Sequence, residues 1–235
     1  MTATKKALLI IFFTVFLISS NSAQQNTDSL KYRNNPNYNL QMDMFEAYKT
    51  NRANVIMYGN SLTAGTNWSE LLGRNDVIGR GIPSDVLIGF FARLNSIYKL
   101  KPKVVFLMGG LNDIYNWTNV DEIYFTYIRI IHALQVRKIT PVIQSTLYAG
   151  KDWAKEWGGT PESNAGRNRE VEKLNKMLSD YAKKNNIEYI DLVSKMSTND
   201  KFMRPDFTWD GIHLNAKGYL IWAKEVEAVL QKLKL

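Results

Sequence analysis

The amino-acid sequence predicts an α/β protein, a three-layer α/β/α sandwich with about five parallel strands. Short apolar runs, several of them rich in Val and Ile, are typical of strands buried in a sheet. Between these runs lie longer segments whose apolar residues recur at three- and four-residue steps, as in helices that cover a sheet. Strands that alternate with helices pair in parallel through right-handed crossovers, and this arrangement gives the sandwich.

The first 23 residues have the pattern of a secretory signal peptide. Lys5 and Lys6 precede an apolar run from Ala7 to Ile18, and small and polar residues follow up to Ala23. A membrane span needs about 20 apolar residues, so this run is short for one. We expect cleavage after Ala23 and export of the protein, either to the periplasm or outside the cell. An uncleaved N-terminal anchor in the membrane is the alternative.

The rest of the chain predicts one domain after a polar lead-in. Residues 24–41 are polar and include Asn34-Asn35-Pro36-Asn37, which predicts a flexible segment. A single domain is expected over residues 42–235, with no internal repeat. The predicted strands are 53–58, 77–80, 104–108, 141–146 and 188–192, and the predicted helices lie around 68–72, 84–98, 121–137, 169–185 and 216–233.

Charge and cysteine content narrow the classes of function. The formal net charge is +8, but the cations are scattered among acids, as Lys173 is beside Glu170 and Glu172. This distribution favours a solvated surface and no nucleic-acid partner. The chain has no cysteine, which excludes thiol nucleophiles and thiolate metal sites. The two histidines are too few to supply the ligands of a metal hydrolase, so we expect no metal.

A serine follows the first predicted strand, in Gly59-Asn60-Ser61-Leu62-Thr63. Ligands of open parallel sheets bind beyond the carboxyl ends of the strands, so a serine at this turn is placed to face them. The N-terminus of a helix after the turn also favours negative charge. Taken alone, this serine is equally typical of a helix cap.

A serine nucleophile needs a base, and the chain has only two histidines. His132 lies in the middle of a predicted helix, remote from any strand end, which is typical of a structural histidine. His213 lies in the loop before the last helix, three residues after Asp210. One tight turn can bring that carboxylate to the ring, where it would fix the tautomer and stabilise the imidazolium.

An ester hydrolase also needs donors for the oxyanion. Asn112, in the segment after the third strand, offers an uncharged amide, and the glycines before it allow close approach. After the second strand, Gly81 offers a backbone N–H that no side chain shields. Each signal is weak alone, because Asn and Gly are common in loops.

Taken together, these residues resemble the SGNH (or GDSL) hydrolase superfamily. The similarity runs from about Val55 to Trp222, and the segment from Asp210 to Asn215 is its most specific part. The segment Gly110-Leu111-Asn112-Asp113 is the next most specific.

The resemblance implies Ser61 as the nucleophile, His213 as the base and Asp210 as the group that orients it. It implies an oxyanion hole made of the N–H groups of Ser61 and Gly81 and the Asn112 side chain. It also implies a flavodoxin-like sheet and no cofactor.

The sequence departs from the family pattern at two positions. Asn60 stands where the family usually has Asp, so a hydrogen-bond acceptor is kept but a negative charge is lost. Gly79 stands where similar sequences often have Asn.

Aromatic residues follow several strand ends, and flat aromatic faces are common in sugar-binding clefts. Among them we expect Trp117 and Trp153 to bind substrate. We therefore expect an exported serine ester hydrolase that removes small acyl groups, acetyl above all, from carbohydrates, with no stable membrane partner once the signal is cleaved. The alternatives are a lysophospholipase, thioesterase or acyltransferase with the same residues, and a carbohydrate-binding protein without catalysis.

Overall fold

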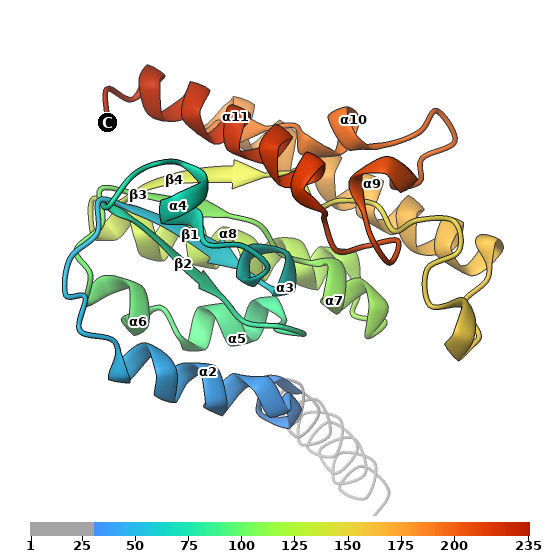
Figure 1. The fold of residues 1–235 in the computed structure, drawn as a ribbon, viewed down its shortest axis with the longest axis horizontal. Helices are drawn as coiled ribbons and strands as arrows, with labels where there is room; N and C mark the ends of the chain where they lie inside the picture. Colours follow the sequence, from blue (N-terminus) through green and yellow to red (C-terminus); the bar gives the residue numbers. More distant parts are fainter. Residues whose placement is uncertain (1–30) are drawn as a thin grey trace, which may run out of the picture.

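The computed structural model describes residues 31–235 and contains a sheet of parallel strands flanked by helices (Figure 1). The sheet order is β2-β1-β3-β4-β5. The predicted α/β/α sandwich with five parallel strands is confirmed. The strands are β1 Val55–Gly59, β2 Val77–Gly81, β3 Val104–Leu107, β4 Thr140–Gln144 and β5 Glu188–Ile190.

In the described part of the chain, one helix precedes the first strand and helices follow every strand. They are α2 Pro36–Ala47, α3 Ser61–Ala64, α4 Trp68–Leu71, α5 Leu87–Ala92, α6 Asn95–Tyr98, α7 Leu111–Tyr115, α8 Val120–Val136, α9 Pro161–Lys184, α10 Leu192–Met196 and α11 Ala216–Lys232, with short 3₁₀ turns η1 Lys31–Asn34, η2 Lys155–Trp157 and η3 Pro205–Phe207.

The crossovers place these helices in two layers. The chain moves from β1 to β2 in one direction and from β2 through β3 to β5 in the other, so right-handed connections place α4 on one face and α5, α8 and α9 on the other. Helix α11 follows the last strand and packs on the face that α4 covers. The rings of Trp68 in α4 and Trp222 in α11 meet at 4.8 Å, while α8 contacts both α5 and α9. Helix α2 lies outermost, beyond α5 and α6 (Figure 1).

The centre of the sheet sets the position of the site. All five residues of β1 are buried, because β1 lies between β2 and β3 and has a helical layer on each face. Tyr58 pairs with Arg80 on one side and with Leu107 on the other. The strand order reverses between β1 and β3, and ligands of such sheets bind beyond the strand ends at this switch point.

The flexible segment expected up to residue 41 is wrong for its second half, because helix α2 begins at Pro36. The Asn35 side chain accepts a hydrogen bond from the Asn37 N–H, and Pro36 occupies the first turn, where its missing N–H costs nothing. Asn35 also donates to the Pro83 carbonyl oxygen at 2.8 Å. Tyr38 is buried and its hydroxyl reaches the Gly89 carbonyl at 3.3 Å.

The signal peptide expected at residues 1–23 lies outside the described residues. Within residues 31–235, no helix combines the length and the apolar character that a membrane span requires.

Candidate active site

Ser61 is the first residue of α3, directly beyond the carboxyl end of β1. The turn needs Gly59, because a Cβ there would collide with the Thr63 hydroxyl and lie 2.9 Å from the Met108 carbonyl oxygen. Asn60 caps the helix, and its Oδ1 accepts from the Leu62 N–H at 3.0 Å. These contacts hold the serine beyond the carboxyl end of a central strand, as the sequence predicts.

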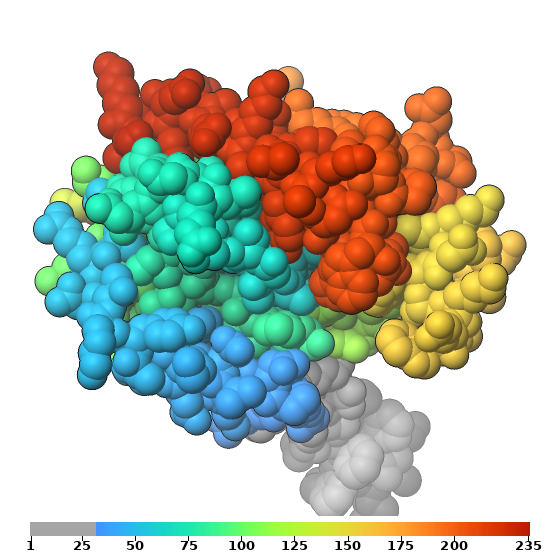
Figure 2. All heavy atoms as spheres, in the orientation of Figure 1, coloured from blue at the N-terminus to red at the C-terminus, as the bar shows by residue number. Residues whose placement is uncertain are grey.

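The structure brings Ser61, His213 and Asp210 together. The Ser61 Oγ lies 3.0 Å from His213 Nε2, and Asp210 Oδ2 lies 2.6 Å from His213 Nδ1. The carboxylate accepts at Nδ1, which assigns the ring hydrogen to that nitrogen and leaves Nε2 to accept from the serine hydroxyl. Figure 2 shows the teal segment around residue 65 and the red-orange segment around residue 210 adjoining on one face.

The loop before α11 holds Asp210 as an acceptor. Its Oδ1 accepts from the N–H groups of Ile212 and His213 at 2.9 and 2.7 Å. Partial burial acts to raise the pKa of Asp210, but the hydrogen bonds from the His213 ring and from these two N–H groups outweigh it and hold the pKa below its ordinary value. The side chain is therefore a carboxylate over the neutral pH range.

Two tryptophans flank the His213 ring. The Trp209 indole is stacked on the imidazole, with 5.7 Å between centroids and 21° between planes. Trp153, which the sequence predicted as a substrate-binding residue, meets the same ring edge-on at 6.0 Å. The structure therefore places Trp153 beside the catalytic candidates, half-buried in the loop after β4.

Asn112 is the second residue of α7, beyond the carboxyl end of β3. Its Nδ2 donates to the Asp85 carbonyl oxygen at 2.9 Å. An amide nitrogen carries two hydrogens, so one remains for another acceptor. Gly110 precedes the helix with φ of 104°, a conformation that favours glycine.

The expectation that the Gly81 N–H joins the oxyanion hole is wrong. The Gly59 carbonyl accepts from the Ile82 N–H, and the Tyr58 carbonyl is taken by Met108 on the opposite side of β1. Successive peptide groups of a strand point to opposite sides, so the Gly81 N–H points to the open edge of β2, away from β1 and Ser61. Gly81 has a packing role instead, since a Cβ would collide with the Ala64 nitrogen in α3.

The loop after β2 contains a residue that sequence reasoning missed. Ser84 is exposed and has φ of 58°, a conformation that few residues other than glycine adopt. It directly precedes Asp85, whose carbonyl holds Asn112. Within residues 31–235, the Ser84 N–H makes no intramolecular hydrogen bond. The signal in the sequence is the turn Pro83-Ser84-Asp85.

Trp117 follows α7 and, like Asn112, lies in the segment after the carboxyl end of β3. It is 82% exposed and has φ of 59°, which is unusual for so large a side chain. The Arg167 guanidinium lies 3.2 Å from the centroid of its indole and donates to the Ile114 carbonyl at 2.6 Å. Trp117 is therefore an aromatic platform fixed from one side.

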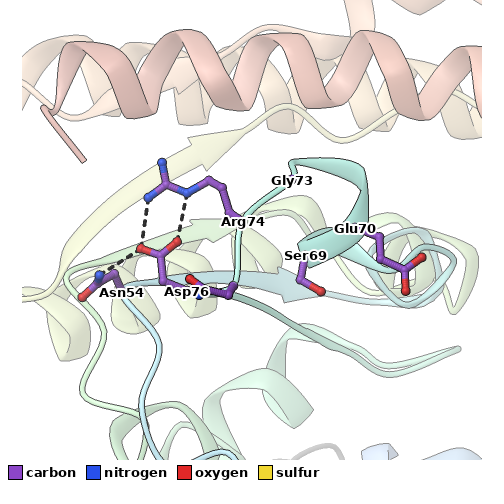
Figure 3. Close-up of a pocket in the computed structure, with 7 residues that line it drawn as sticks. Asn54, Ser69, Glu70, Gly73, Arg74 and Asp76 are labelled. Atoms are coloured by element: carbon purple, nitrogen blue, oxygen red, sulfur yellow. Dashed lines mark hydrogen bonds and ion pairs between the residues drawn. The ribbon is translucent and has the colours of Figure 1, made fainter.

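A separate hollow of about 820 Å³ lies at the opposite end of the strands, where β1 and β2 begin (Figure 3). It is lined by Asn54, before β1, and by the segment before β2, where Arg74 and Asp76 form an ion pair with hydrogen bonds of 2.9 and 3.0 Å. Ligands of parallel sheets bind at the other end of the strands, so we do not assign chemistry to this hollow.

Solved structures of known proteins share this fold. A GDSL-like lipase from Bacteroides thetaiotaomicron is 25% identical, with a TM-score of 0.69 over 84% of this chain and 98% of its own. A Bacteroides fragilis protein assigned as an acylhydrolase is also 25% identical, with a TM-score of 0.69 over 83% and 97%. An acetyl xylan esterase shares the fold at 22% identity, with a TM-score of 0.60 over 75% and 98%. No curated protein matches the sequence.

The family comparison covers most of the domain. The model of the GDSL-like lipase/acylhydrolase family matches residues 57–221, a range that includes Ser61, Asn112, Asp210 and His213. The chain therefore belongs to the GDSL-like lipase/acylhydrolase family, whose members are serine ester hydrolases.

Proposed function

We propose that Ser61 attacks the ester carbonyl carbon while His213 Nε2 takes its proton. The 3.0 Å separation of the two atoms supports this role, because a general base must lie within hydrogen-bond reach of the proton it removes. His213 then gives the proton to the leaving alcohol oxygen as the carbon–oxygen bond breaks. Water attacks the acyl-enzyme, His213 takes the water proton and returns it to Ser61, and the free acid leaves. Asp210 orients the ring throughout.

The proposed oxyanion hole consists of the Ser61 N–H, the Asn112 amide and the Ser84 N–H, which replaces Gly81. The Ser84 N–H lies in the loop that also supplies the acceptor of Asn112, and it has no intramolecular partner within residues 31–235. Donors that are fixed before the reaction stabilise the oxyanion without reorganisation.

The proposed substrate is a carbohydrate ester of a small acyl group, acetyl in the first place. The exposed Trp117 platform and the half-buried Trp153 beside His213 support it, because sugar rings stack on such faces. Trp117 holds a strained backbone while exposed to solvent, and strain of this kind is typical of functional sites. The acetyl xylan esterase with the same fold is consistent with this substrate class.

A second hollow, of about 440 Å³, also supports a sugar substrate. It adjoins the site at Trp209 and Asp210 and is bordered by the polar side chains of Lys151, Asp152 and Asp200. Hydroxyl groups of a neighbouring sugar unit can pair with charged groups of this kind.

Turnover of p-nitrophenyl acetate tests the catalytic assignment. Ser61→Ala is expected to abolish turnover and labelling by a fluorophosphonate probe, while the protein stays folded. Normal turnover by this variant would contradict the nucleophile. Failure of the folded wild-type protein to react with the probe would favour a carbohydrate-binding protein without catalysis.

Acyl-chain preference and sugar dependence test the substrate class. A series of p-nitrophenyl esters is expected to show highest kcat/KM for acetate, and a strong preference for long chains would favour a lysophospholipase or thioesterase. Trp117→Ala is expected to raise KM for acetylated xylan and leave p-nitrophenyl acetate unchanged. Phe125→Ala, which removes a 65% exposed ring on α8, is the matched control.

Export after signal cleavage, with no stable membrane partner, also remains a proposal, supported by the sequence of residues 1–23. N-terminal sequencing of the protein recovered from the producing cells, with fractionation, tests it. A mature chain that begins at Gln24 in a soluble exported fraction is expected, and an intact N-terminus in the membrane fraction would favour the anchor.

A further inference from the structure

Asp85 and Arg93 form an ion pair that is completely buried. Both side chains are 0% exposed, and Arg93 Nε lies 2.7 Å from Asp85 Oδ2. Removing two charges from water costs several kcal/mol per ion in proteins, and apolar side chains of similar volume often stabilise a core equally well. The bonds that this pair makes to the backbone indicate a role other than core stability.

The guanidinium joins the ends of two strands. Arg93 Nη2 donates to the Gly59 carbonyl at 2.8 Å, and Nη1 donates to the Arg80 carbonyl at 2.9 Å. The rings of Tyr58 and Phe90 lie 4.3 and 4.8 Å from the guanidinium carbon. Because a guanidinium is planar and rigid, its three bonds fix the carboxyl ends of β1 and β2 relative to Asp85.

Asp85 connects the same network to Asn112, one of the three donors of the proposed oxyanion hole. Its backbone carbonyl accepts from Asn112 Nδ2 at 2.9 Å, and its Oδ1 accepts from the Val86 N–H at 3.0 Å. Gly59 lies two residues before Ser61, and Ser84 directly precedes Asp85. The Ser84 donor is therefore one residue from this pair, the Asn112 donor is one hydrogen bond from it, and Ser61 lies two residues beyond a carbonyl that is hydrogen-bonded to it.

We propose that Asp85 and Arg93 are positioning residues, which hold the turn before Ser61, the Ser84 loop and the Asn112 amide in the geometry that the oxyanion requires. This inference rests on the proposed ester hydrolysis. Neither side chain touches the substrate. Because the oxyanion forms only in the transition state, loosening its donors lowers kcat and leaves substrate binding nearly unchanged.

The test compares Arg93→Lys with Arg74→Lys. Lysine keeps the charge but cannot make three bonds in one plane. Arg74 is the matched control, because it forms a similar ion pair, with Asp76, at the opposite ends of the same strands (Figure 3). Fluorophosphonate labelling carried to completion gives the concentration of folded active sites. The kcat for p-nitrophenyl acetate is then expressed per labelled site, and KM is measured in the same assay.

Arg93→Lys is expected to lower kcat per labelled site by about 100-fold, the scale of losing one oxyanion donor, with KM changed less than about threefold. Arg74→Lys is expected to keep kcat. Methylguanidinium is expected to restore part of the rate of Arg93→Gly. If Arg93→Lys lowers the melting temperature but keeps wild-type kcat per site, the pair is only structural and the proposal is wrong.

Asp85→Asn decides the question where the Arg93 variants do not fold. It preserves the shape of the side chain and is expected to lower kcat per labelled site with KM retained, and an unchanged kcat would overturn the proposal. Wild-type protein that neither labels nor turns over an ester refutes the proposed function itself, which is a different result from any of these.

Discussion

The Trp209 indole lies nearly parallel to the His213 imidazole, at 5.7 Å between centroids, although 73% of the Trp209 surface is exposed. Asp210 fixes the ring of His213 at one edge, and Trp153 meets it from another side. The stack therefore covers a face of the imidazole that the carboxylate leaves open. We expect this contact to restrict rotation of the ring away from Ser61.

Trp209→Ala is expected to lower kcat by about two- to tenfold, because an aromatic pair contributes about 0.5–1.5 kcal/mol and each 1.4 kcal/mol is about tenfold in rate. Trp209→Phe is expected to retain most of the activity. Kinetics with p-nitrophenyl acetate measure this effect, and Trp157→Ala, which removes an 81% exposed indole in the loop after β4, is the control. Equal kcat for Trp209→Ala and the wild type would show that the stack does not position His213.

The alternation of strands and helices could be predicted from the sequence, because burial of the sheet on both faces requires continuous apolar runs. The apolar pattern alone does not extend to the start of α9, at Pro161, and predicts a helix only from about residue 169. Residues 161–168 include no large apolar side chain, and Asn164 and Asn168 are buried through hydrogen bonds to distant backbone groups, such as the bond from Asn168 to Lys201 at 2.8 Å. Apolar periodicity does not report contacts of this kind.

In the site, too, some residues could be predicted from the sequence and others depend on contacts that the sequence pattern does not report. The histidine near Ser61 could be chosen because the chain has only two and one of them lies within a helix. The sequence favours Gly81 because no side chain shields its backbone N–H, but the direction of that N–H depends on strand register. A shift of one residue reverses that direction. The sequence Pro83-Ser84-Asp85 indicates a turn, but the positive φ of Ser84, on which its proposed role as a donor rests, could be recognised only from three-dimensional structure.

The cap on α3 gives a prediction about the departure from the family pattern. Asn60→Ala is expected to destabilise the fold by about 1–2 kcal/mol, because the buried Leu62 N–H loses its acceptor. Asn60→Asp keeps an acceptor at the helix N-terminus and is expected to unfold within about 1 kcal/mol of the wild type. Urea unfolding at pH 7 measures both values. Equal stability of Asn60→Ala and the wild type would mean that the cap contributes little.

The lowered pKa of Asp210 predicts a dependence of stability on pH. Partial burial raises that pKa, but the hydrogen bonds from His213 and Ile212 lower it by more than burial raises it. The pKa in the folded protein is therefore below the unfolded value of about 3.9. The charged form therefore stabilises the fold above about pH 4, and this stabilisation is lost as pH falls through the folded-state pKa. The difference in unfolding free energy between the wild type and Asp210→Asn is expected to shrink from pH 6 to pH 3. A constant difference would contradict the shift.

Asp85 predicts the opposite dependence. Burial raises its pKa to about 6, and the Arg93 guanidinium opposes this rise only in part. The folded protein therefore binds a proton more tightly than the unfolded chain, whose aspartate pKa is about 3.9. Between about pH 6 and pH 4 the stability of the wild type relative to Asp85→Asn is expected to increase as pH falls, because protonation removes a buried charge. Urea unfolding of both proteins at steps of half a pH unit measures this difference, and Asp76→Asn, at the partly exposed ion pair at the opposite end of the strands, is the control. A relative stability of the wild type that decreases over this range would mean that Arg93 outweighs burial and that the pair is held as two charges throughout.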